Sequence, residues 1–102
     1  MTVTALLALT LAACTTTREA ALLDARLRSD GRVVDIVAAA CNPTHTDVTL
    51  DEAPGEVQAL VTVTAPSENE DCATEAAIEL DEPLGDRAVA DALTQRRVDV
   101  SR

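Results

Sequence analysis

Four residues of this chain could hold a metal or carry out covalent chemistry: Cys14, Cys41, His45 and Cys72. Structural zinc takes four ligands, usually supplied as closely spaced pairs. The spacing here is wide and a fourth ligand is lacking beside Cys41, Cys72 and His45, so we expect no metal site. Acyl transfer would need His45 as a base between a nucleophile and an orienting acid. Hydroxyl and carboxyl groups adjoin it in sequence, but neighbours along a loop do not form a triad. We therefore expect no catalytic site, no cofactor and no enzymatic activity.

Carboxylates are the second chemical resource of the chain. Between Arg32 and Arg87 lie thirteen of them and no Lys or Arg. They cluster at Asp51-Glu52-Glu56 and Glu68-Glu70-Asp71. Calcium takes six to eight oxygen ligands from flexible loops, but the spacing of a calcium-binding loop is missing. A solvated acidic face is the favoured interpretation, and it would attract a basic protein partner. The alternative is a divalent-cation or small-ligand binding domain that uses these acidic loops.

The N-terminal segment carries the strongest motif. Residues 3–13 are apolar apart from two threonines, which is too short for a helix across about 30 Å of hydrocarbon but matches the apolar part of a signal peptide. Leu11-Ala12-Ala13-Cys14 resembles the lipobox of bacterial lipoproteins: a branched aliphatic residue, two small residues, then cysteine. The resemblance implies diacylglycerol on the sulfur of Cys14 and cleavage just before it. The alternative is that residues 3–13 form a buried helix or strand.

This motif predicts the domain organisation. Residues 1–13 would be a signal peptide, residues 14–18 the lipidated N-terminus and a polar tether, and residues 19–102 one small β-domain. The mature protein would then be held by its lipid at the extracytoplasmic face of the cell membrane, either at the cell surface or in the periplasm.

Assigning Cys14 to lipid leaves Cys41 and Cys72 as an even pair in an exported chain. Small exported domains use such pairs as disulfides, so we predict a Cys41–Cys72 bridge. It would close a loop of roughly 30 residues and contribute about 3–4 kcal/mol. That contribution matters because the chain has no Phe, Tyr or Trp. Its core must come from Val, Leu, Ile and Ala, and a domain this small has little stability to spare.

Alternation of apolar and polar residues predicts an all-β fold, a small antiparallel sandwich or open barrel of about six to seven short strands. Leu23, Ala25 and Leu27 are expected to share the buried face of the first strand. Asp30-Gly31 predicts the first hairpin turn. The expected strands cover 23–28, 32–40, 47–52, 57–65, 75–81, 87–93 and 98–100. The alternative is an α+β domain with a terminal helix, because residues 18–28 and 86–97 have high helix propensity.

A second resemblance lies near the C-terminus. The segment Glu79-Leu80-Asp81-Glu82-Pro83-Leu84-Gly85-Asp86-Arg87 is similar to one in small uncharacterised secreted proteins of high-GC bacteria. Those proteins combine a lipobox or signal peptide, short strands and two later cysteines. The resemblance supports export and a disulfide, and it implies no activity.

The charge balance excludes several partners. The formal net charge is −10 at pH 7, all eight basic residues are arginines, and every charged side chain follows Cys14. Nucleic acid is not an expected partner, because phosphate neutralisation needs a basic face. Anionic headgroups would repel the domain, so the lipid on Cys14 is its expected membrane contact. We expect a monomeric, non-enzymatic protein-interaction or structural domain.

Overall fold

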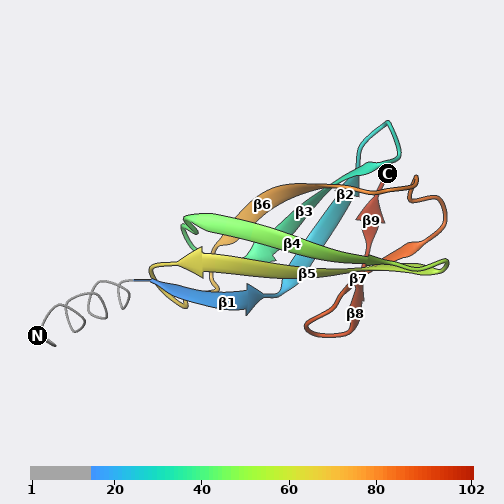
Figure 1. The fold of residues 1–102 in the computed structure, drawn as a ribbon. Helices are drawn as coiled ribbons and strands as arrows, with labels where there is room; N and C mark the ends of the chain where they lie inside the picture. Colours follow the sequence, from blue (N-terminus) through green and yellow to red (C-terminus); the bar gives the residue numbers. More distant parts are fainter. Residues whose placement is uncertain (1–14) are drawn as a thin grey trace, which may run out of the picture.

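The structure, a computed structural model, describes residues 15–102, so the expected signal peptide at 1–13 and Cys14 lie outside the described residues. This range is all-β, with strands in two layers and no helix (Figure 1). The all-β prediction is confirmed, and residues 18–28 and 86–97 contain strands rather than the alternative helices. The nine strands are β1 (Thr16–Ala20), β2 (Leu22–Leu27), β3 (Val33–Ala39), β4 (His45–Glu52), β5 (Glu56–Ala65), β6 (Ala73–Glu79), β7 (Ala88–Asp91), β8 (Arg96–Val98) and β9 (Val100–Ser101).

The first sheet is built around β5. Strand β4 pairs antiparallel with it along one edge, from His45 opposite Thr64 to Glu52 opposite Val57. The other edge of β5 is shared, because β1 pairs antiparallel with residues 61–65 and β7 pairs parallel with residues 56–59. Strand β8 then adds to β7. Every second side chain of β5 is fully buried, as its alternation predicts: Val57, Ala59, Val61, Val63 and Ala65.

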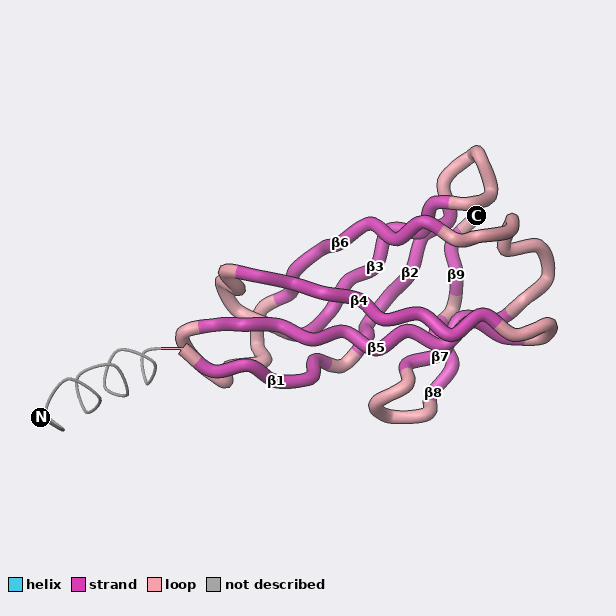
Figure 2. The backbone as a smooth tube through the Cα atoms, in the orientation of Figure 1, coloured by secondary structure: helices cyan, strands magenta, loops and turns pink. Residues whose placement is uncertain are grey.

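The second sheet has the order β6-β3-β2-β9 and covers the inner face of the first (Figure 2). Val34, Ile36 and Ala38 of β3 are buried between the layers. Among the strand pairs of residues 15–102, β5–β7 and β2–β9 are parallel, whereas the sequence predicted antiparallel pairing. Strand β1 covers only half of the β5 edge, and β7 satisfies backbone groups in the other half that would otherwise lack partners.

A β-bulge changes the face of one predicted core residue. Leu22 lies opposite Ala38 and Asp24 opposite Val37, so Leu23 is the extra residue between them. Leu22 is 7% exposed and Leu23 is 54% exposed. The prediction that Leu23 shares the buried face of Ala25 is therefore wrong, because one inserted residue reverses the alternation of side chains on a strand.

Strand β1 begins within the residues predicted to be a tether. Residues 16–18, expected to belong to a polar tether, form the start of β1, where Thr16 lies opposite Ala65 and Arg18 opposite Val63. The run Thr-Thr-Arg-Glu has no alternating apolar residues, so it gave no strand signal. Threonine nevertheless fits a pleated surface well. The sandwich thus begins two residues after Cys14.

Over residues 15–102 the chain changes sheets five times, first between β1 and β2 and last between β8 and β9. Asp91, the last residue of β7, ties the first of these crossings to the C-terminal hairpin. Its carboxylate accepts hydrogen bonds from the Leu22 amide at 2.9 Å, the Leu93 amide at 3.0 Å and the Thr94 hydroxyl at 3.1 Å. Asp91 is 1% exposed and is the one charged side chain buried within residues 15–102. Three donors offset the cost of burying it.

Replacing Asp91 with alanine should lower the free energy of unfolding by about 3 kcal/mol, because the buried Leu22 amide loses its acceptor and the hairpin loses its tie to β2. Chemical denaturation followed by circular dichroism measures this. Asp99→Ala, at an exposed position between β8 and β9, is the matched control and should change little. Equal stability of both variants would contradict the role given to Asp91.

Candidate functional site

The disulfide-bearing end of the sandwich brings the predicted cysteine pair together. Cys41 follows β3, Cys72 precedes β6, and their sulfurs are bonded with the Cα atoms 4.8 Å apart. This confirms the predicted bridge. The Ala40 amide also donates to the Cys72 carbonyl at 3.1 Å, so backbone and side chains join the same two segments. Cys41 is 5% exposed, which places the bridge at the edge of the core.

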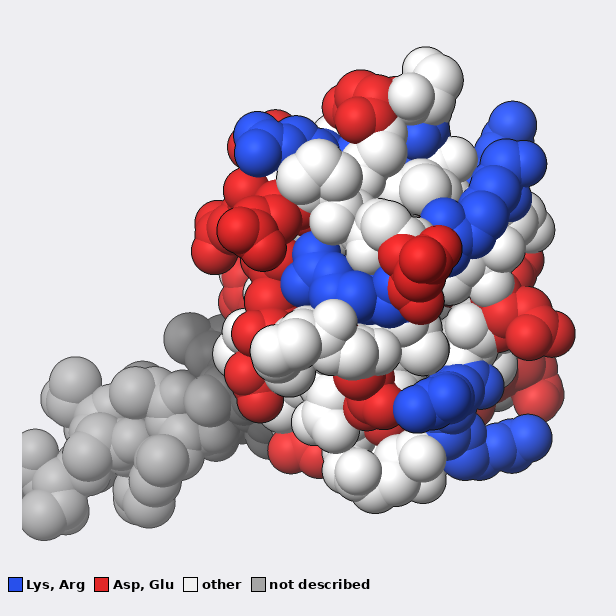
Figure 3. Space-filling model, turned by 90° about the vertical axis from the view of Figure 1, so that its right-hand side faces the viewer, with Lys and Arg blue, Asp and Glu red and all other residues white. Residues whose placement is uncertain are grey.

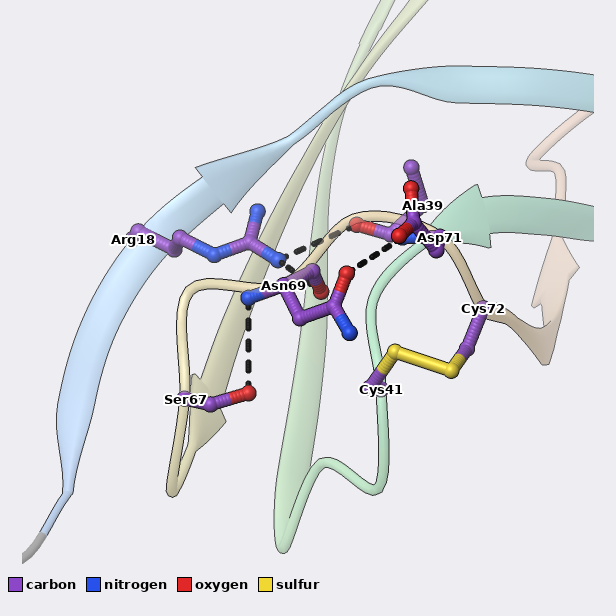
Figure 4. Close-up of a disulfide and its surroundings, with 7 residues drawn as sticks. All are labelled: Arg18, Ala39, Cys41, Ser67, Asn69, Asp71 and Cys72. Atoms are coloured by element: carbon purple, nitrogen blue, oxygen red, sulfur yellow. Dashed lines mark hydrogen bonds between the residues drawn. A yellow bond between two sulfur atoms is a disulfide. The ribbon is translucent and has the colours of Figure 1, made fainter.

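Arg18 of β1 joins this end of the molecule to the loop that precedes Cys72 (Figure 4). Its guanidinium donates to the Ala39 carbonyl at 3.2 Å and to the Asn69 carbonyl at 3.5 Å, and it lies 3.6 Å from the Glu70 carboxylate. The loop is shaped by its own side chains, since Asn69 accepts from the Asp71 amide at 2.9 Å. Arg18 therefore places β1, β3 and the acidic loop side by side.

The environment of Arg18 makes this contact a structural one. Only 15% of its side chain is exposed, and its Nε atom is buried without a hydrogen-bond partner. A buried cation needs nearby acceptors, and the carbonyls of Ala39 and Asn69 supply them. Because no Lys or Arg occurs between Arg32 and Arg87, Arg18 also offsets negative charge in the loop at 67–71.

His45 begins β4 and is exposed. Its Nε2 atom lies 2.9 Å from Oδ2 of Asp47, two residues along the same face of the strand. Among the described residues its hydrogen-bond partners include no serine, threonine or cysteine side chain. Nor does the structure, over residues 15–102, gather three or more His, Cys, Asp or Glu side chains where they could hold a metal ion.

The far end of β4 carries the most buried ion pair of the described chain. Nη1 of Arg87 lies 3.2 Å from Oε1 of Glu52, with 12% and 16% of the two side chains exposed. Arg87 also donates to the carbonyls of Glu82, Pro83 and Leu84. An open cleft of about 680 Å³ adjoins this pair, and Figure 3 shows blue and red side chains intermingled over this end of the molecule.

These contacts explain what the segment 79–87 does in the fold. Leu80 and Leu84 enter the core with 2% and 0% exposure. Gly85 has a φ of +59°, a conformation that glycine adopts without the strain of a side chain. Arg87 then stabilises the turn by donating hydrogen bonds to the backbone carbonyls of Glu82, Pro83 and Leu84. All of its nitrogen atoms are engaged, so the cleft presents carboxylates rather than a free cation.

Glu52 is also the group here whose ionisation stabilises the fold. Its pKa is held below its ordinary value of 4.5, first because its carboxylate accepts the Asp81 amide at 2.8 Å, and second because Arg87 donates to it. Partial burial opposes both effects. A depressed pKa in the folded state means that the ionised form stabilises the protein above pH 4.5 and that this stabilisation is lost as the pH falls.

The acidic clusters predicted from sequence are partly used inside the fold. Glu52 contacts Arg87, Glu56 contacts Arg97 and Glu70 contacts Arg18. Sequence reasoning missed Arg18, Arg87 and Asp91 as structural ties. Nothing local in sequence indicates them, because each has a partner far along the chain: Ala39 for Arg18, Glu52 for Arg87 and Leu22 for Asp91, which are 21, 35 and 69 residues away. Within residues 15–102 no helix is long and apolar enough to cross a membrane.

Glu52→Gln should lower the denaturant midpoint at pH 7, because the neutral glutamine carries no charge to form an ion pair with Arg87. The difference from wild type should shrink as the pH falls from 5 to 3, where Glu52 itself becomes protonated. Urea denaturation across this pH range measures the effect. Glu79→Gln, on the exposed face of β6, is the control. A difference that stays constant with pH would show that the charge of Glu52 contributes nothing.

Removing the bridge with Cys41→Ser and Cys72→Ser should lower the free energy of unfolding by about 4 kcal/mol, because the unfolded chain regains the entropy of a loop of 31 residues. Guanidinium denaturation measures this, with Cys14→Ser in both proteins to prevent thiol exchange. Wild-type-like stability of the variant without the bridge would refute the prediction.

Comparison with known protein families, with curated proteins and with solved structures found no match to this chain. What the chain does must therefore be inferred from its own residues. The bridge, the position at which β1 begins, and the distribution of charge are the features that bear on function.

Proposed function

We propose that this chain is an exported lipoprotein, anchored by lipid on Cys14 at the extracytoplasmic face of the cell membrane, and that its β-sandwich acts through protein contacts rather than as an enzyme. The observation that carries the proposal is the Cys41–Cys72 bridge. Disulfides form and persist in oxidising compartments, whereas cytosolic thiols are kept reduced. A bridge that closes the sandwich is therefore compatible with export and poorly suited to the cytosol.

The start of the fold supports an anchor at Cys14. Strand β1 begins at Thr16 and is paired from its first residue. Lipid on Cys14 would therefore hold the sandwich close to the membrane with only Thr15 between them. A diacylglycerol anchor supplies two acyl chains, which is enough for stable membrane residence. The loop with Glu68, Glu70 and Asp71 lies at this end and would be repelled by anionic headgroups.

The outer strands support a protein partner. Within the described residues, β4 pairs only with β5 and β6 only with β3, so each leaves one edge free. Exposed carboxylates lie along both strands: Asp47 and Asp51 on β4, Glu75 and Glu79 on β6. We call these four side chains the acidic edge. The ends of β4 and β6 meet where the Asp81 amide donates to Glu52. A basic partner would be attracted here by long-range, salt-sensitive steering.

Expression of the full chain and of Cys14→Ser in a bacterial host tests the anchor. We expect wild type in the membrane fraction, with an intact mass that lacks residues 1–13 and includes lipid. Cys14→Ser should lose the lipid and keep its N-terminal segment, because cleavage follows lipidation. An unmodified mass for residues 1–102 in the soluble fraction of the wild type would overturn the proposal.

A further inference from the structure

A small pocket lies beside the bulge in β2, away from the bridge and from the acidic edge. Its volume is about 280 Å³. It lies where the end of β1 and the start of β2 meet the β7–β8 hairpin. The residues that define its chemistry are Leu23, Asp91, Thr94, Arg96, Arg97 and Val98. Neither the disulfide nor the Glu52–Arg87 pair contributes to it.

One wall of the pocket is apolar and exposed. Leu23 and Leu93 are the two large apolar side chains that stand out from the surface of residues 15–102, at 54% and 42% exposure. Leu23 lines the pocket itself, and Leu93 belongs to the hairpin turn beside it. The bulge is what turns Leu23 outward, and bulges commonly re-aim a side chain at a binding site.

The rim of the pocket is cationic, in contrast to the acidic molecule around it. Arg96 and Arg97 are both exposed. Among the described residues Arg96 forms no ion pair, and Arg97 has one long contact of 3.5 Å with Glu56 while 72% of its side chain is exposed. The two residues are neighbours on β8, so their side chains leave opposite faces of the strand. Arg96 lies opposite Asp91, on the face that also carries Val98, whereas Arg97 lies opposite Ala90. The Arg96 guanidinium is therefore free to bind a carboxylate or phosphate in the two-pronged geometry that arginine favours.

The floor of the pocket is rigid and already satisfied. The Asp91 carboxylate accepts from the Leu22 amide, the Leu93 amide and the Thr94 hydroxyl. These bonds fix the positions of both the bulged strand and the hairpin that carries the arginines. The apolar wall and the cationic rim are thus held at a fixed spacing before any ligand arrives, which lowers the entropic cost of binding.

We propose that this pocket binds a small organic anion with a short aliphatic chain, whose charged head contacts Arg96 and whose chain lies on Leu23. A volume of about 280 Å³ suits a ligand smaller than a typical drug. Binding at this pocket requires neither lipid on Cys14 nor a basic partner, so an experiment that contradicts it would leave the function proposed above untouched.

Three probes separate the two parts of the proposed recognition: hexanoate carries both charge and chain, acetate carries the charge, and hexanamide carries the chain. Each is titrated into the isotope-labelled, oxidised full chain while amide chemical shifts are recorded. We expect hexanoate alone to give saturable shifts centred on residues 22–23 and 91–98. Acetate matching hexanoate would reduce the site to nonspecific anion attraction and overturn the proposal, as would shifts centred elsewhere.

Variants then test the residues. Arg96→Gln should weaken hexanoate binding by about tenfold or more, because charge-assisted hydrogen bonds are lost. Leu23→Ser should weaken it while leaving the charge intact. Arg26→Gln, an exposed arginine of β2 outside the pocket, is the matched control and should bind as wild type does. Equal weakening by Arg26→Gln would show a general charge effect, and saturable binding of an acidic peptide without binding of hexanoate would assign the surface to a protein; either result overturns the proposal.

Discussion

The Cys41–Cys72 bridge joins the two ends of the segment that contains β4 and β5, and β5 is the centre of the first sheet. Strands β3 and β6 are neighbours, with Ala39 opposite Ala73. Between β3 and β6 the chain crosses to the first sheet, forms the β4–β5 hairpin there and crosses back. The bridge links the residues at which this segment begins and ends. In a core that contains no aromatic side chain, each buried residue removes less apolar surface from water, so the closed loop contributes a large share of the stability.

Three polar side chains connect separate elements of the fold, in addition to the contacts of the aliphatic core. Arg18 connects β1 to the end of β3 and to the acidic loop, Arg87 fastens the turn after β6 to the end of β4, and Asp91 joins the first crossing between sheets to the last hairpin. All three have low exposure and long-range partners. They bind groups at or near the ends of strands, where the chain passes from one element to the next.

Periodicity predicted the regular parts of this fold and missed the parts set by distant contacts. The alternation in β5 and β3 identified their buried faces, and counting cysteines identified the bridge. The bulge at Leu23 was hidden because one extra residue leaves the local pattern unchanged while reversing the face. Strand β1 was hidden because its pairing with β5 does not depend on an apolar stripe. Asp91 looked like an ordinary polar position in the run Arg-Ala-Val-Ala-Asp-Ala-Leu, and its partner Leu22 is 69 residues away.

The proposed function requires that the bridge of this sandwich forms outside the reducing cytosol. The state of the cysteines in living cells tests it most directly. Thiols are trapped with iodoacetamide in intact cells, and the purified chain is weighed before and after reduction and a second alkylation. We expect Cys41 and Cys72 to carry no label at first and both to become labelled only after reduction. Label on both cysteines in the unreduced protein would contradict it.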